Sequence, residues 1–238
     1  MGWAELRQVG FATLDHEAAV RTATELLALG PGFGDPLLAA VHLADFTAPV
    51  GPDTYVEVLA PTTPDHSVAR WLGRVGGSSG WVLSTQVPSL DGVKERAAEC
   101  GVRVAVETQA MATSSSCTRS TSACCSSWTR SCPGTPGSGM TCPRPGPRTP
   151  PAPPRRTTSP PSTSPPAAMA ATWAAIIGLD PPAATVDGAA IAFSSRTIRF
   201  VPATSGRTGI VAVDVHATDR EHGAGVQGEL CRTVIRFV

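Results

Sequence analysis

A long stretch in the middle of this chain lacks the large apolar side chains from which hydrophobic cores are built. Residues 107–175 contain no Val, Ile, Leu, Phe or Tyr, and residues 108–179 contain no Asp or Glu. Such a composition cannot bury enough apolar surface to offset the conformational entropy lost on folding. We therefore expect a disordered segment rich in Pro, Ser, Thr and Arg at 111–167, between folded regions at 1–110 and 168–238.

Three interpretations of this segment remain open. Its six arginines give it a charge of +6, whereas the thirteen cationic and nineteen acidic side chains elsewhere give −6. The charge suits a tail that binds nucleic acid, and the composition also suits a natural linker. The third interpretation is a displaced reading frame. Apart from Met, the residue types in 112–166 all have codons with C or G in the middle position. In a GC-rich gene the third codon base is almost always C or G, so a frame that reads this base as the middle base would give such a composition. A displaced frame predicts that the chain as written lacks part of a module and is impaired in function.

The first folded region shows the order strand, helix, strand, strand. An apolar run at Leu6–Leu14 predicts a strand, and Asp15 predicts the N-cap of an amphipathic helix. Two β-rich runs follow at Val41–Phe46 and Thr54–Leu59, separated by residues typical of turns.

A similar order starts again further along the chain. A helix at Val68–Val75 leads to a strand at Trp81–Val87, a helix capped by Ser89 and a strand at Val102–Val106. Beyond the central segment the sequence predicts one helix and four strands: Ala168–Ile177, then Ala189–Phe193, Thr197–Val201, Gly209–Val215 and Thr233–Val238. The recurrence indicates repeated small modules of strands and helices.

Two polar residues stand in the middle of otherwise apolar strands. Gln8 and Glu57 are costly to bury without partners. Either they lie on a solvent-exposed sheet face, or they point into a concave sheet and coordinate a divalent metal through oxygen. The five histidines show no metal-ligand spacing, and we expect His16, in the first turn of its helix, to be solvated.

The first hundred residues resemble a known superfamily. The strand LRQVGFAT, the Asp-capped helix ending in LALGPGF, and TYVEVLAPT followed by a Gly-Gly loop are similar to glyoxalase-like proteins of the vicinal oxygen chelate superfamily. The resemblance covers roughly residues 5–107 well and 168–238 more faintly. It implies an α+β fold of repeated βαβββ modules paired into an open, cleft-bearing barrel, here interrupted by the disordered segment.

The resemblance also implies a site and a chemistry. Ligands in this superfamily come from the first and last strands of each module, where this chain has Gln8 and Glu57. The partner module should supply two more, but it has Trp81 in its first strand and no last strand as written. The implied cofactor is a divalent metal such as Zn, Ni, Fe or Mn, with Glu57 also the catalytic group that moves a proton.

Three functions therefore stay open. The first is a metal-dependent lyase or isomerase acting on a small molecule with vicinal oxygens, and the second is a metal-free protein that binds or sequesters a small molecule on the same fold. The third is nucleic-acid binding through the arginine-rich segment. Modules could pair within one chain or across a homodimer. The N-terminus carries acidic and basic residues and no long apolar run, and no apolar run in the chain is long enough to span a membrane. The number of cysteines is odd. We therefore expect a cytoplasmic protein without membrane association.

Overall fold

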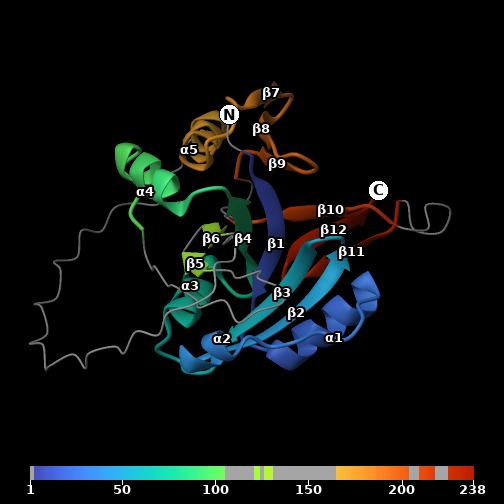
Figure 1. The fold of residues 1–238 in the computed structure, drawn as a ribbon. Coiled ribbons are helices and arrows are strands. Elements are labelled where there is room, and N and C mark those ends of the chain that lie inside the picture. The colour runs from blue at the N-terminus through green and yellow to red at the C-terminus, as the bar shows by residue number, and fades with distance from the viewer. Residues whose placement is uncertain (1–2, 105–120, 124–125, 131–164, 204–208, 218–224) are drawn as a thin grey trace, which may run out of the picture.

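The described part of the chain combines helices and strands in an α+β arrangement with three separate sheets (Figure 1). The computed structural model describes residues 3–104, 121–123, 126–130, 165–203, 209–217 and 225–238. Its largest sheet has the strand order β2-β3-β1-β4-β6-β5, and two three-stranded sheets have the orders β10-β12-β11 and β7-β8-β9. These sheets do not close into a barrel.

Apart from the short helix α2, the N-terminal part follows the order expected from the sequence. Its elements are β1 (Glu5–Ala12), α1 (His16–Leu27), α2 (Pro36–Ala40), β2 (Leu43–Gly51), β3 (Thr54–Pro61), α3 (Ser67–Val75), β4 (Ser79–Val87) and α4 (Leu90–Glu99). Asp15 caps α1 by accepting a hydrogen bond from the Ala18 amide at 3.0 Å, and Ser89 caps α4 by accepting one from the Gly92 amide at 3.3 Å. Both caps were expected, because Asp and Ser side chains satisfy the free amides of a first helical turn.

Strand β1 lies at the centre of the large sheet. It pairs in parallel with β3, which forms an antiparallel hairpin with β2, and it pairs antiparallel with β4 on its other side. Helix α1 connects the hairpin to β1 and packs Ala19 and Ala23 against a buried cluster of strand residues: Val9, Phe11, Val56 and Val58. Helix α3 packs Val68 and Leu72 against Ala12 and Leu43 in a second cluster.

The C-terminal part packs onto the same cores. It comprises α5 (Pro166–Ile177), β7 (Ala183–Thr185), β8 (Gly188–Ala192), β9 (Thr197–Phe200), β10 (Ala212–Val215), β11 (Gln227–Leu230) and β12 (Thr233–Phe237). Leu230 and Ile235 complete the core beneath α1, and α5 shares a third core with α4. Apolar burial therefore joins segments that are far apart in the sequence.

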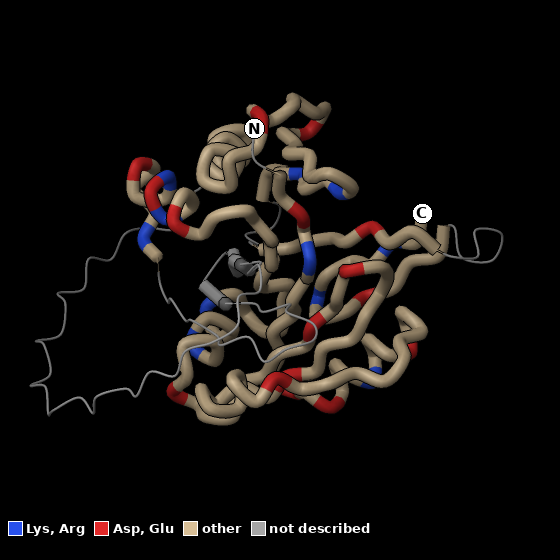
Figure 2. The backbone as a smooth tube through the Cα atoms, viewed as in Figure 1, with Lys and Arg blue, Asp and Glu red and all other residues tan. Residues whose placement is uncertain are grey.

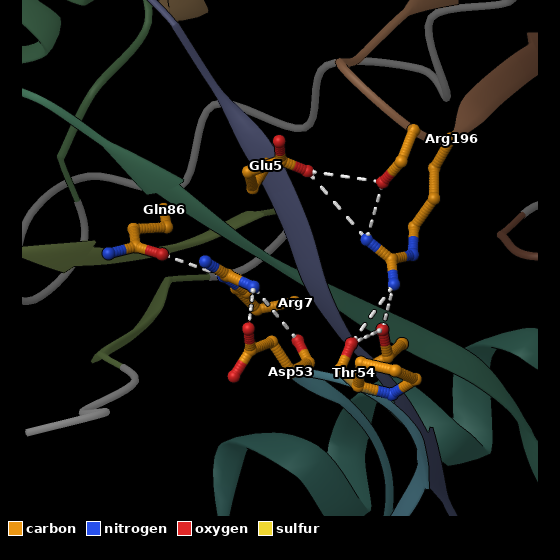
Figure 3. A network of polar contacts seen from close by, with 8 residues as sticks. Glu5, Arg7, Asp53, Thr54, Gln86 and Arg196 are labelled. Atoms are coloured by element: carbon orange, nitrogen blue, oxygen red, sulfur yellow. Dashed lines mark hydrogen bonds and ion pairs between the residues drawn. The ribbon is translucent and has the colours of Figure 1, made fainter. Parts of the chain in front are cut away.

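Arginine side chains add polar contacts between the two parts. Arg96 of α4 donates to the carbonyls of Ile176 and Ile177 at 2.9 and 3.2 Å, which caps the C-terminal end of α5. Figure 3 shows Arg196, from the turn between β8 and β9, reaching Glu5 of β1 and the Thr54 hydroxyl of β3. These contacts fix the C-terminal sheet β7-β8-β9 at the start of β1.

The second network in Figure 3 centres on Arg7. Its Nε donates to the Gln86 side chain at 2.6 Å, and its Nη1 lies 3.5 Å from an Asp53 carboxylate oxygen. Arg7 therefore ties β4 and the β2–β3 turn to the central strand.

The prediction that 112–166 lacks regular secondary structure is wrong for two short strands. Strand β6 (Ser126–Arg130) pairs in parallel with the end of β4, and β5 (Thr121–Ala123) pairs antiparallel with β6. The edge of β4 offers backbone donors and acceptors, and a strand that pairs there needs no large apolar side chain. Pro166, at the end of that segment, is the first residue of α5. Residues 112–120, 124–125 and 131–164, with the disorder and nucleic-acid predictions made for them, lie outside the described residues.

The strand expected at Val102–Val106 is also absent in part. Residues 102–104 have no regular structure, and 105–106 lie outside the described residues. No helix in the described ranges is long and apolar enough to span a membrane. Basic and acidic positions are interspersed over most of the described backbone (Figure 2).

Candidate functional site

The structure brings together the two polar residues that the sequence singled out. Gly10 of β1 pairs with Glu57 of β3, and Gln8 is two residues before Gly10, so its side chain leaves the same face of the strand. The Gln8 side chain is hydrogen-bonded to the Glu57 carboxyl group. Gln8 is 7% and Glu57 4% exposed. The exposed-face alternative is therefore wrong, since both side chains are buried.

Gly10 makes room for the Glu57 carboxyl group. A Cβ atom at this position would lie 3.2 Å from Glu57 Oε2 and would collide with Cγ1 of Val82 in β4. The carboxyl group and the Val82 side chain thus occupy the space above the bare Gly10 backbone. Glu57 Oε2 is buried and has no hydrogen-bond partner in the part of the chain that the structure describes. One oxygen of the carboxyl group is therefore left for a proton or a ligand.

Burial governs the protonation of Glu57. Loss of solvent raises its pKa from 4.5 to about 8, and the negative charges of Asp45 and, more weakly, Asp35 act in the same direction. The hydrogen bond from Gln8 opposes the rise because it stabilises the carboxylate. A carboxyl group with a pKa near 8 both donates and accepts protons close to neutral pH, as general acid–base catalysis requires.

Asp45 of β2 is a half-buried polar group that the sequence analysis did not select. Its Oδ1 and Oδ2 accept hydrogen bonds from the Asp35 amide at 3.0 and 2.9 Å. Burial raises the Asp45 pKa; the Asp35 charge adds to this, whereas the Asp35 amide and His16 oppose it. The signal that selected Gln8 and Glu57, a polar residue inside an apolar strand, is also present at Asp45 in Val41–Phe46.

The described residues do not fit a divalent metal centre. No group of three or more His, Cys, Asp or Glu side chains in the described ranges could hold an ion. Gln8 and Glu57 supply two oxygen donors, whereas stable protein sites use three or more ligands. Trp81, in the strand expected to carry a further ligand, packs against Trp71 with ring centroids 6.2 Å apart.

Comparisons with known proteins give a partial likeness. No protein-family model matches the sequence, and no curated protein matches it. Methylmalonyl-CoA epimerase from Mycobacterium tuberculosis is 24% identical, covering 43% of this chain and 68% of that protein, with a TM-score of 0.36. A hypothetical protein from Bacillus halodurans is 17% identical, covering 43% of this chain and 72% of that protein, with a TM-score of 0.38. A methylmalonyl-CoA epimerase in complex with methylmalonyl-CoA is 18% identical, covering 44% of this chain and 74% of that protein, with a TM-score of 0.37. At these TM-scores, the likeness does not establish a shared fold or function.

Proposed function

We propose that the chain is a glyoxalase-like protein that binds a small oxygen-bearing molecule beside Gln8 and Glu57, and that Glu57 transfers a proton to or from it. The single observation that carries this proposal is the buried, unpartnered Oε2 of Glu57 above Gly10. The order β1, α1, β2, β3, with only the short helix α2 between α1 and β2, and the parallel pairing of β1 and β3 support it, since this order agrees with the opening of a βαβββ module.

The proposed reaction class is isomerisation or elimination through a proton on carbon next to a carbonyl group. Such a step needs a base whose pKa is close to the working pH, and Glu57 meets this requirement. A side-chain hydrogen bond with Gln8 lowers the pKa of the carboxyl group and so favours its basic form. No step is assigned to a metal ion.

Deuterium exchange tests this proposal without requiring a known substrate. Hydroxyacetone and dihydroxyacetone, which carry vicinal oxygens, are incubated with the purified chain in D2O near neutral pH, and loss of their α-proton signals is followed by NMR. We expect the chain to accelerate exchange and Glu57→Gln to slow it on the order of 100-fold. The exposed Asp65→Asn variant is the matched control and should behave as the parent chain. Exchange that is equal in the Glu57→Gln variant would contradict the role of Glu57.

A second candidate function is metal-free binding or sequestration of a small molecule. The lack of a metal-binding group among the described residues favours it over a metal-dependent enzyme. Saturation-transfer NMR separates the two: binding of the same probes without exchange supports a binding protein. Stoichiometric metal in the purified chain, lost in Glu57→Ala, would instead support a metal enzyme with ligands beyond the described residues.

A further inference from the structure

A hollow lies beside strand β2. It has a volume of about 420 Å³, within the range of small-molecule sites, opens to solvent, and is lined by the first turns of α1, the segment 32–34 and β2. Phe33 and Thr47 join that segment to the sheet through backbone hydrogen bonds of 2.9 and 2.8 Å. Neither Gln8 nor Glu57 lines this hollow, which we name the α1–β2 pocket.

The apolar part of the pocket is aromatic. Phe33, Phe46 and Val20 line it, and Phe33 is 56% exposed. The Phe46 ring lies against Gly32, where a Cβ atom would collide with it. Aromatic side chains beside bare backbone form a surface suited to a flat ring.

The polar part of the pocket carries one buried atom without a partner. His16 Nε2 is shielded from solvent and has no hydrogen-bond partner in the described ranges, so the expectation of a solvated His16 is wrong for this atom. Asp45 also lines the pocket and is held in place by the Asp35 amide. A ligand that donates hydrogen bonds would satisfy the Asp45 carboxylate, and it would also satisfy His16 Nε2 in the neutral tautomer that carries its proton on Nδ1.

Two carboxyl groups, Glu17 and Asp45, and one guanidinium group, Arg21, line the pocket, and the surrounding segment is acidic. Residues 15–51, which include α1, α2 and β2, hold five acidic residues and one arginine, Arg21. Acidic positions gather along this edge of the molecule (Figure 2). Aromatic faces and carboxylates both attract cations, and a planar cation can contact both at once.

We propose that the α1–β2 pocket binds a small planar organic cation, with its ring against Phe33 and Phe46 and its N–H groups directed to Asp45 and His16. An amidinium or guanidinium group on an aromatic ring has this chemistry. Asp45 is electrostatically linked to Glu57, but Phe33 and Phe46 line this pocket and do not act on the Glu57 pKa, so loss of benzamidine binding in the Phe33→Ala variant is distinguishable from failure of the proposed function.

Binding of benzamidine to the full chain at pH 7 tests the proposal, measured by titration calorimetry and ligand-observed NMR. A small ligand in an open pocket should bind with a Kd on the order of 1 mM. Benzoate has a similar shape and the opposite charge, and we expect it to bind at least about tenfold more weakly. Neutral benzamide should fall between the two.

Two variants connect binding to this pocket. Phe33→Ala should weaken benzamidine binding roughly fivefold, and its matched control is Leu37→Ala, which removes a neighbouring side chain that is 55% exposed and does not line the pocket. Asp45→Asn should weaken binding roughly tenfold, with Asp65→Asn as control. Circular dichroism confirms that each variant is folded, and the exposed Phe33 keeps the test valid if Asp45→Asn is unstable. Undetectable benzamidine binding, equal affinity for benzoate, or unchanged affinity in the Phe33→Ala variant would each overturn the proposal.

Discussion

Replacing Glu57 by glutamine should change how the stability of the protein depends on pH. In the folded chain burial keeps the carboxyl group protonated up to a pH of about 8, whereas in the unfolded chain it ionises near 4.5. Between these values the folded state binds more protons than the unfolded state. The free energy of unfolding therefore falls as pH rises through this window, and Glu57 contributes no further change below or above it.

The magnitude follows from the two pKa values. A rise from 4.5 to about 8 corresponds to roughly 5 kcal/mol of lost stability at the alkaline end of the window. A loss of this size is comparable with the whole free energy of unfolding of a marginally stable domain. Glutamine has nearly the same shape and no charge, so Glu57→Gln removes this loss. We expect the variant to gain on the parent chain progressively from pH 4.5 to pH 8.

Urea denaturation followed by tryptophan fluorescence, repeated at intervals from pH 4.5 to 9, measures both curves. Subtracting the free energy of unfolding of the parent chain from that of the variant at each pH largely removes the contribution of other titrating groups. Asp45 is one of these groups, because burial also raises its pKa. Asp65→Asn removes an exposed carboxyl group and should leave the parent curve nearly unchanged. Parallel curves for Glu57→Gln and the parent chain would refute the reasoning, because they would show that Glu57 titrates alike in the folded and unfolded states.

Three further outcomes are expected. Gly10→Ala should lower the free energy of unfolding by about 1–3 kcal/mol in urea titrations, because its methyl group would collide with Val82, and Val82→Ala in the same chain should recover part of the loss. Arg96→Met should cost about 1–2 kcal/mol by the same assay, because it uncaps α5, while Arg103→Met should cost little. Sequencing of the gene should show that the alternate frame between about 110 and 167 encodes strand-like protein, and the chain with that frame restored should be more active. A confirmed frame together with a soluble chain that unfolds cooperatively would contradict this last expectation.

Local signals in the sequence were sufficient for the helices and strands with strong boundaries. Asp15 and Ser89 cap α1 and α4 as expected, because an N-cap depends on one side chain and the amides that follow it. The short elements α2, β7 and β11, of three to five residues each, were not predicted. They carry too few residues to show a period, and pairing or packing with distant segments determines them.

The candidate site was predicted in part. The cost of burying a polar side chain inside an apolar strand selected Gln8 and Glu57, and this signal is contained in each strand alone. The role of Asp45 depends on the Asp35 amide, ten residues earlier, which meets it only after the chain has folded around β2. No spacing rule in the sequence indicates that contact.

The energetics of Glu57 also bear on whether it is structural or functional. A buried carboxyl group that lowers stability toward alkaline pH does not strengthen the fold, and Gln at the same position could keep the contact with Gln8 without a charge. The parallel register of β1 and β3 sets Glu57 opposite Gly10. Gly10 leaves space for both the Glu57 carboxyl group and the Val82 side chain, whereas a residue with a Cβ atom would collide with Val82. The local structure therefore accommodates an unfavourable group whose second oxygen remains unpartnered among the described residues. Groups with strongly raised pKa values and free hydrogen-bonding capacity are concentrated at functional sites, which favours proton transfer over a structural role for Glu57.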